Sequence, residues 1–174
     1  MEIARGRRNH IYGWDANGKF FWRAPTVEVF HGTLEAEIDA IQRGVSVRRG
    51  FPFTDFGRGF YTTSLEAQAR RWATQRVDTA GGCGAIIRFE IDTEALEQFS
   101  VLDLAHADGE FWEIVDRYRV DQDREPHGYD IVVGLVAKSW GRSRVVHPVM
   151  DQISFHTADV VRLLDASKQT IILL

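Results

Sequence analysis

After the first 25 residues, apolar and polar positions follow the periods of strands and helices along most of the chain. Period-two or continuous apolar runs predict strands at 27–30, 60–63, 85–91, 131–136, 152–155 and 170–174. Apolar positions at helical spacing predict helices at 34–42, 64–77, 110–120 and 158–164. Short strands mixed with a few helices predict an α+β domain.

Residues that are typical of helix ends support several of these boundaries. Gly44 follows the first predicted helix, where a glycine is favoured. Ser64 is expected to cap the second helix, with Glu66 and Gln68 in its first turn. The run 131–136 is apolar throughout, so we expect a strand buried on both faces.

The first 25 residues carry several aromatic side chains but no sustained period. Aromatic residues in such number are typical of a segment that packs on a folded body. We therefore interpret 1–25 as an extension packed on a domain that spans 26–174.

Composition indicates one soluble domain. A chain of 174 residues with 44% hydrophobic and 26% charged residues can bury a core of its own. The single Cys83 excludes an internal disulfide and a cysteine-based zinc cluster, and the six histidines form no metal-binding spacing. No apolar run follows the basic start, and 171–174 is too short to span a bilayer. We expect a cytoplasmic protein without metal or membrane contact.

The formal net charge of −4 argues against broad binding to nucleic acid. Positive charge is still dense locally, because Arg43, Arg48, Arg49 and Arg58 lie in one short stretch. Such a stretch is compatible with a solvated face. It is also compatible with a pyrophosphate site, since guanidinium groups bind phosphate oxygens in pairs.

Three segments carry the candidate chemistry. His31-Gly32-Thr33 ends the first predicted strand, and 55–63 reads Asp-Phe-Gly-Arg-Gly-Phe-Tyr-Thr-Thr ahead of a helix that contains Trp72. The third segment, 151–157, reads Asp-Gln-Ile-Ser-Phe-His-Thr. Taken singly, each has an ordinary structural explanation, such as a hydrogen-bonded histidine, a glycine turn or core aromatics.

Taken together, the order and spacing of these segments resemble the His-Tyr-Glu branch of the ADP-ribosyltransferase superfamily, which includes the poly(ADP-ribose) polymerases and diphtheria toxin. More closely, the chain resembles an uncharacterised bacterial family with an Asp-Phe-Gly-x-Gly-Phe-Tyr stretch, often encoded beside toxin–antitoxin genes. The resemblance covers about 26–164. It implies an ADP-ribosyltransferase-like split β-sheet domain with flanking helices.

The resemblance also implies roles for individual residues. His31 corresponds to the histidine that binds the adenosine-side ribose of NAD, and Gly32, with Thr33 beside it, to the backbone that binds the nicotinamide carboxamide. Arg58, Gly59, Phe60 and Tyr61 match the stretch that places a tyrosine against the nicotinamide ring. The second stacking aromatic of the family lies eleven residues later, at Trp72. The serine that bonds the carboxamide in the polymerases is replaced by Ala69.

These roles suit the chemistry of NAD. Two aromatic walls stack on a flat cationic ring and add about 0.5–2 kcal/mol each by cation–π attraction. Stacking uses the ring face alone, so Tyr61→Phe is expected to change NAD binding little. Breaking the bond to nicotinamide builds positive charge on the ribose, and a nearby acceptor stabilises that charge.

Gln152 stands where the family has its catalytic glutamate. Its amide can accept a hydrogen bond from a ribose hydroxyl but carries no charge. Either the acceptor of ADP-ribose brings a good nucleophile, or Asp151 or Asp130 supplies the charge, or the domain binds NAD without turnover. We favour the first interpretation and take His31, Tyr61 and Gln152 as the catalytic candidates.

The resemblance thus implies a mono-ADP-ribosyltransferase that uses NAD as a substrate and modifies a macromolecular acceptor. It also implies a toxin with an antitoxin protein as partner. An NAD glycohydrolase, in which water replaces the acceptor, is the alternative enzyme. A non-catalytic regulator that binds NAD or ADP-ribose is the alternative from another class.

Overall fold

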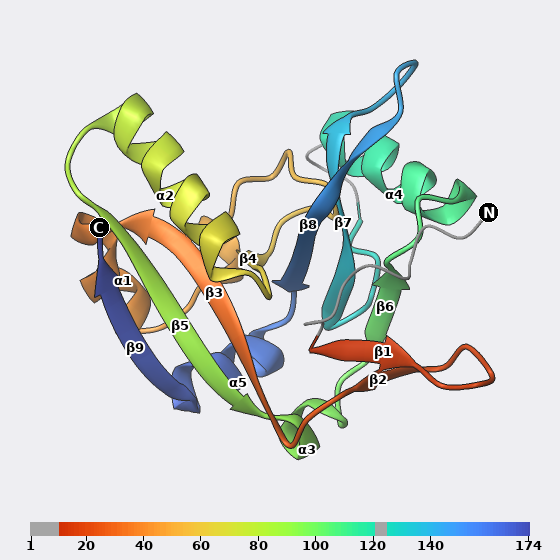
Figure 1. The fold of residues 1–174 in the computed structure, drawn as a ribbon, viewed down its shortest axis with the longest axis horizontal. Coiled ribbons are helices and arrows are strands. Elements are labelled where there is room, and N and C mark those ends of the chain that lie inside the picture. The colour runs from red at the N-terminus through yellow and green to blue at the C-terminus, as the bar shows by residue number, and fades with distance from the viewer. Residues whose placement is uncertain (1–10, 121–124) are drawn as a thin grey trace.

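The computed structural model describes residues 11–120 and 125–174, which form an α+β fold as predicted (Figure 1). Its strands are β1 (Tyr12–Trp14), β2 (Phe20–Trp22), β3 (Thr26–Leu34), β4 (Phe60–Thr62), β5 (Gly84–Asp92), β6 (Val101–Leu104), β7 (Ile131–Ser139), β8 (Val145–Phe155) and β9 (Lys168–Leu173). Its α-helices are α1 (Ile38–Gln42), α2 (Glu66–Ala80), α3 (Thr93–Leu96), α4 (Gly109–Val120) and α5 (Ala158–Ala166), with 3₁₀ turns η1 (Glu35–Glu37) and η2 (Val47–Arg49). None of these helices is long and apolar enough to cross a membrane.

Two larger sheets make up the body of the fold. One has the antiparallel order β3-β5-β9, and the other has the order β4-β8-β7-β6, with β6 and β7 parallel. The sheets meet where Phe30 and Thr63 exchange backbone hydrogen bonds of 2.9 and 3.0 Å. This bridge brings the end of β3 beside β4, so segments thirty residues apart in sequence become neighbours.

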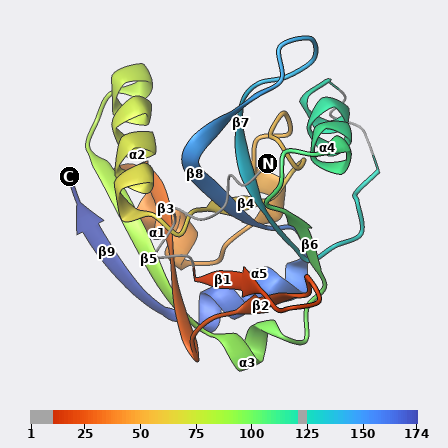
Figure 2. The same ribbon diagram turned by 45° about the vertical axis from the view of Figure 1, so that its right-hand side comes forward.

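The central core lies between the two sheets. Strand residues of both sheets contribute to it, and α5 adds the apolar face formed by Val160, Val161 and Leu164. A second core lies under α4, where Phe111 and Val115 pack on Val132 of β7. Figure 2 shows α2 along the β3–β5–β9 sheet and α4 beside the other sheet. Buried and exposed residues alternate over the first four residues of β3, whereas the last six residues of β8 are all buried, so this part of β8 is covered on both faces.

Residues 11–25 form the β1–β2 hairpin, whereas 1–10 of the interpreted extension lie outside the described residues. Tyr12 is only 2% exposed and packs on Phe20 and Trp22 within the central core. The absence of a period in this segment had predicted no strand. A three-residue strand is too short to establish a period.

Several elements differ from their predicted bounds. The first predicted helix is divided into the turn η1 and α1, and strands β1, β2 and β6 and helix α3 had not been predicted. Strand β8 begins at Val145, because its first part pairs with β7 across register shifts. Pro148 lacks a backbone N–H, so its presence argued against a strand in this part of the sequence.

The predicted cap of the second helix is wrong. Helix α2 begins at Glu66 after Leu65, and no side chain caps it. The hydroxyl of Ser64 donates instead to the carboxylate of Asp151 on β8. Ser64 therefore joins the start of α2 to β8 through a charge-assisted hydrogen bond and does not cap the helix.

Candidate functional site

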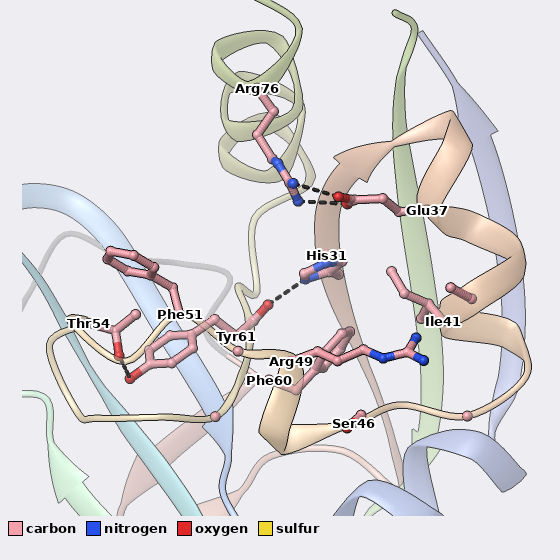
Figure 3. A pocket seen from close by; sticks show the side chains of 14 residues that line it. His31, Glu37, Ile41, Ser46, Arg49, Phe51, Thr54, Phe60, Tyr61 and Arg76 are labelled. Carbon is pink, nitrogen blue, oxygen red and sulfur yellow. Dashed lines mark hydrogen bonds and ion pairs between the residues drawn. The ribbon is translucent and has the colours of Figure 1, made fainter. Parts of the chain in front are cut away.

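Two adjoining cavities lie at the junction of the sheets and share His31, Tyr61 and Arg76. The first has a volume of about 560 Å³ and lies between β3, α1 and the loop before β4 (Figure 3). The second, of about 510 Å³, lies between β3 and α2 and is lined by Gly32 and Trp72. Together they bring two of the three predicted motif segments into one site.

His31 is fixed by two contacts from β4. Its ring stacks on Phe60 at 4.3 Å between centroids, and its Nδ1 lies 2.7 Å from the carbonyl oxygen of Tyr61. Because a carbonyl only accepts, Nδ1 carries the hydrogen. Burial lowers the pKa of His31, so the ring is neutral near pH 7. Its Nε2 is therefore a hydrogen-bond acceptor, suited to a hydroxyl of a ligand.

Tyr61 lines both cavities, and its hydroxyl is bonded to the loop that precedes β4. The hydroxyl donates to the carbonyl of Gly57 at 2.8 Å and accepts from the N–H of Phe56 at 3.1 Å. It also lies 2.8 Å from the hydroxyl of Thr54. Burial raises the pKa of Tyr61, so the hydroxyl stays protonated. The hydroxyl thus has a structural role that the stacking argument left out.

Gly32 and Trp72 shape the second cavity from β3 and α2. A Cβ on Gly32 would lie 2.0 Å from the backbone oxygen of Ala69, so only glycine allows this strand and helix to approach so closely. Trp72 lines the cavity opposite β3 together with Tyr61. Both aromatic residues therefore contribute to the wall of the same cavity.

A bidentate ion pair between Arg76 of α2 and Glu37 of η1 spans the wall of the first cavity (Figure 3). The two hydrogen bonds measure 2.7 and 2.6 Å. Neither residue belongs to the three motif segments of the sequence. Arg76 lies one helical turn after Trp72, and this spacing on one helix face was the signal that could have found it.

Arg58 was expected to bind the ligand, but it lies outside both cavities. Its guanidinium donates to the backbone carbonyls of Arg48 and Gly50 at 2.9 and 3.0 Å, and it lines neither cavity. Arg49 lines the first cavity instead. Both arginines are exposed, but only Arg49 of the two lines a cavity, so Arg49 is the one placed for a ligand.

Of the remaining predicted binding residues, two line a cavity and one lies behind it. Gly59 and Phe60 line the first cavity. Thr33 is fully buried and donates to the carboxylate of Glu37, so it supports the ion pair from behind.

Gln152 lies on β8, next to β4, but lines neither cavity. It is 4% exposed, and its Nε2 donates to Asp55 Oδ2 at 2.6 Å and to the carbonyl of Leu135 at 2.7 Å. By strand alternation its side chain shares a sheet face with Tyr61, whose partner on β8 is Ser154. The structure therefore joins His31 and Tyr61 directly, and it places Gln152 on the strand next to β4 with its side chain outside both cavities.

Asp151 and Asp130 were considered as sources of the negative charge that Gln152 lacks, but both carboxylates bind other groups of the protein. Asp151 accepts hydrogen bonds from the hydroxyls of Thr63 and Ser64. Asp130 accepts from Ser100 and Thr157. Neither lines a cavity, so neither is aimed at a ligand in this arrangement.

A further buried carboxylate, Asp55, was part of the motif but had no role assigned to it. It is 2% exposed and forms an ion pair of 2.6 Å with Arg119 of α4. Its importance could have been predicted from the sequence, because Asp55 is followed by phenylalanine and glycine residues. A carboxylate buried among such residues needs a polar or charged partner.

A family model described as "Protein of unknown function (DUF3990)" matches residues 27–143. A comparison with curated proteins finds no match. The matched segment contains His31, Gly32, Tyr61 and Trp72, and ends before Gln152.

Proposed function

We propose that this chain, which belongs to the DUF3990 family, binds NAD in an ADP-ribosyltransferase-like fold and breaks its nicotinamide–ribose bond. Transfer of ADP-ribose to a macromolecular acceptor is the form of the reaction that we favour. The resemblance of the motifs to those of a family encoded beside toxin–antitoxin genes supports a role as a toxin.

One observation carries the proposal: His31, Gly32, Tyr61 and Trp72 converge on one pair of cavities. These four residues come from two strands and a helix, and the motif comparison had given each of them a contact with NAD. The second cavity offers two aromatic side chains and the backbone of β3, which suit a flat cationic ring that carries an amide.

The first cavity suits the ADP part of the ligand. Arg49 supplies an exposed guanidinium for phosphate oxygens, and the acceptor Nε2 of His31 suits a ribose hydroxyl. His31 and Tyr61 line both cavities, which supports a single elongated ligand that contacts the two of them.

In the proposed reaction, the bond between ribose C1′ and the nicotinamide nitrogen breaks, and its electron pair leaves with neutral nicotinamide. A nucleophile of the acceptor then bonds to C1′ and loses its proton. Positive charge on the ribose is largest in between, where acceptor groups of the protein stabilise it.

A non-catalytic regulator that binds NAD is the second candidate. It is favoured by the position of Gln152, which lies outside both cavities and has its amide nitrogen bonded to protein groups.

The test is to incubate the purified protein with NAD and to measure free nicotinamide with and without cell lysate, beside a calorimetric titration with NAD. Release that needs lysate and labels an acceptor supports the transferase. Release without lysate indicates a glycohydrolase, and binding without release indicates the regulator. A protein that neither binds nor cleaves NAD contradicts the proposal.

A matched pair of variants tests the site. Trp72→Leu is expected to weaken NAD binding by about 0.5–2 kcal/mol, because one stacking wall is lost. Trp22→Leu removes a comparably half-buried indole from β2, outside both cavities, and should leave NAD binding unchanged. Equal effects of both variants on binding would remove Trp72 from the site.

A further inference from the structure

Strand β7 has an irregularity beside the candidate site. Its pairing with β8 shifts register between Leu135 and Ala137, so the ladder of backbone hydrogen bonds is interrupted there. The backbone N–H of Ala137 donates to Asp55 Oδ2 at 2.8 Å, and the carbonyl of Leu135 accepts from Gln152 Nε2. Two side chains from distant segments thus complete the interrupted ladder.

Asp55 has its two carboxylate oxygens assigned to different partners. Oδ1 accepts from the guanidinium of Arg119 at 2.6 and 2.7 Å. Oδ2 accepts from Ala137 and from the amide of Gln152. Arg119 also donates to the carbonyl of Phe53, so its orientation is fixed from a second side. The carboxylate is therefore held as a pure acceptor that faces Gln152.

This environment determines which way the amide of Gln152 points. Both hydrogens of Nε2 face acceptors, namely Asp55 Oδ2 and the Leu135 carbonyl. In the described part of the chain, no donor reaches Oε1, and Arg88 Nε is the one buried side-chain polar atom without a partner. Oε1 therefore keeps some solvent exposure on a side chain that is 4% exposed overall, and it is the atom of Gln152 left as an acceptor.

We propose that Asp55 is a positioning residue that fixes the amide of Gln152 with Oε1 left as an acceptor on the sheet face shared with Tyr61, so that an amide rather than a carboxylate is the group that acts on the ribose of bound NAD. The inference rests on the proposed function. The surroundings favour an amide at position 152, because the oxygens of a carboxylate there would face two other acceptors, Asp55 and the Leu135 carbonyl.

A substitution of Gln152 by Glu separates this inference from a role of Gln152 in packing alone. The introduced carboxylate would meet Asp55 and the Leu135 carbonyl, and the charged form would be disfavoured. Once protonated, the introduced carboxyl donates to Asp55 as the amide does and turns its carbonyl oxygen outward. Arg119 faces Asp55 from α4, and Asp151 points to Thr63 and Ser64, so Asp55 is the titratable partner that dictates this behaviour.

The experiment measures nicotinamide release as kcat and KM from about pH 5 to pH 8.5 for wild type, Gln152→Glu and Gln152→Met. At neutral and higher pH, Gln152→Glu should lose about 10²–10³-fold in kcat with little change in KM for NAD. Its kcat relative to wild type should recover as the pH falls. Gln152→Met should lose turnover at every pH, because it offers no acceptor. Full activity of Gln152→Glu across the range, or a loss independent of pH, overturns the inference.

A second variant covers the case in which Gln152→Glu folds poorly at neutral pH. In the double variant Asp55→Asn with Gln152→Glu, the new amide can donate to the new carboxylate. We expect its kcat at neutral pH to exceed that of either single variant, as coupling through direct contact requires. A double variant no better than the worse single variant overturns the inference.

Failure of the proposed function gives a different result. A wild-type protein that neither binds nor cleaves NAD ends the role of Gln152 toward the ribose. The contact with Asp55 is then read from melting temperatures alone. The deficit of Gln152→Glu relative to wild type should shrink as the pH falls, and a constant deficit contradicts the control of Gln152 by Asp55.

Discussion

Tyr61 combines two separate roles in one side chain. Its ring lines both cavities, and its hydroxyl joins the loop at 54–57 to β4. The motif pattern could indicate the first role, because ring stacking depends on residue type and order. The second role depends on backbone atoms of a loop, which no pattern of side chains describes.

Replacement of Tyr61 by Phe tests the two roles separately. Loss of the hydroxyl removes bonds to Phe56 and Gly57, so the free energy of unfolding should fall by about 1–3 kcal/mol. NAD binding should stay close to that of wild type where the variant is folded, because the ring remains. Tyr129→Phe, at a tyrosine that is 39% exposed, should change stability by less than about 0.5 kcal/mol. Urea denaturation and calorimetric titration measure both quantities, and equal stability of the two variants would contradict the role of the Tyr61 hydroxyl.

At the scale of elements, the site depends on the close packing of α2 against β3. Gly32 is the point of closest approach, since a Cβ there would overlap the backbone oxygen of Ala69. Gln68 in the first turn of α2 adds a second tie, because its amide exchanges hydrogen bonds of 2.6 and 3.2 Å with the backbone of Asp151 on β8. Helix α2 is thereby attached to both sheets.

Replacement of Gly32 by Ala should separate this helix from β3. We expect a loss of about 1–3 kcal/mol in the free energy of unfolding, because a backbone atom blocks the new methyl group. Gly109→Ala is the matched control, since no heavy atom lies within 4 Å of the added Cβ at the start of α4. It should be neutral or stabilising by up to about 1 kcal/mol. Thermal melting of both variants measures this difference. Similar melting temperatures would show that α2 can move away from β3 without a loss in the free energy of unfolding.

At the scale of the whole molecule, three partly or fully buried histidines resist protonation. Burial lowers the pKa of His31 and His127, and burial together with neighbouring His127 lowers that of His156 to about 3. His127 and His156 lie 4.4 Å apart between ring centroids, beside the loop that leads into β4.

This arrangement predicts a loss of stability in acid. The unfolded chain takes up protons below about pH 6.5, whereas the folded chain resists them until its lower pKa values are reached. Stability should therefore fall as the pH drops from 6.5, by up to about 1.4 kcal/mol per pH unit for each histidine. Urea unfolding at a series of pH values measures the slope, which His156→Gln should reduce. A slope unchanged by this substitution would assign acid sensitivity to other groups.

The sequence by itself determined the α+β class and most strands and helices, because burial of one face leaves a period in neighbouring residues. The motif resemblance also grouped His31, Gly32, Tyr61 and Trp72, which all line the cavities, whereas Glu37 and Arg76 of the cavity walls were found only in the structure.

The tertiary structure alone decided where the polar side chains go. Asp55 and Gln152 are 97 residues apart, and their hydrogen bond exists because an irregularity in β7 places two strands and a loop together. Likewise, Arg58 binds the carbonyls of Arg48 and Gly50, and Arg49 lines the cavity, because of how the loop before β4 is folded. A hydrogen bond depends on distances of a few tenths of an ångström between distant segments, and periodicity along one segment carries no information about them.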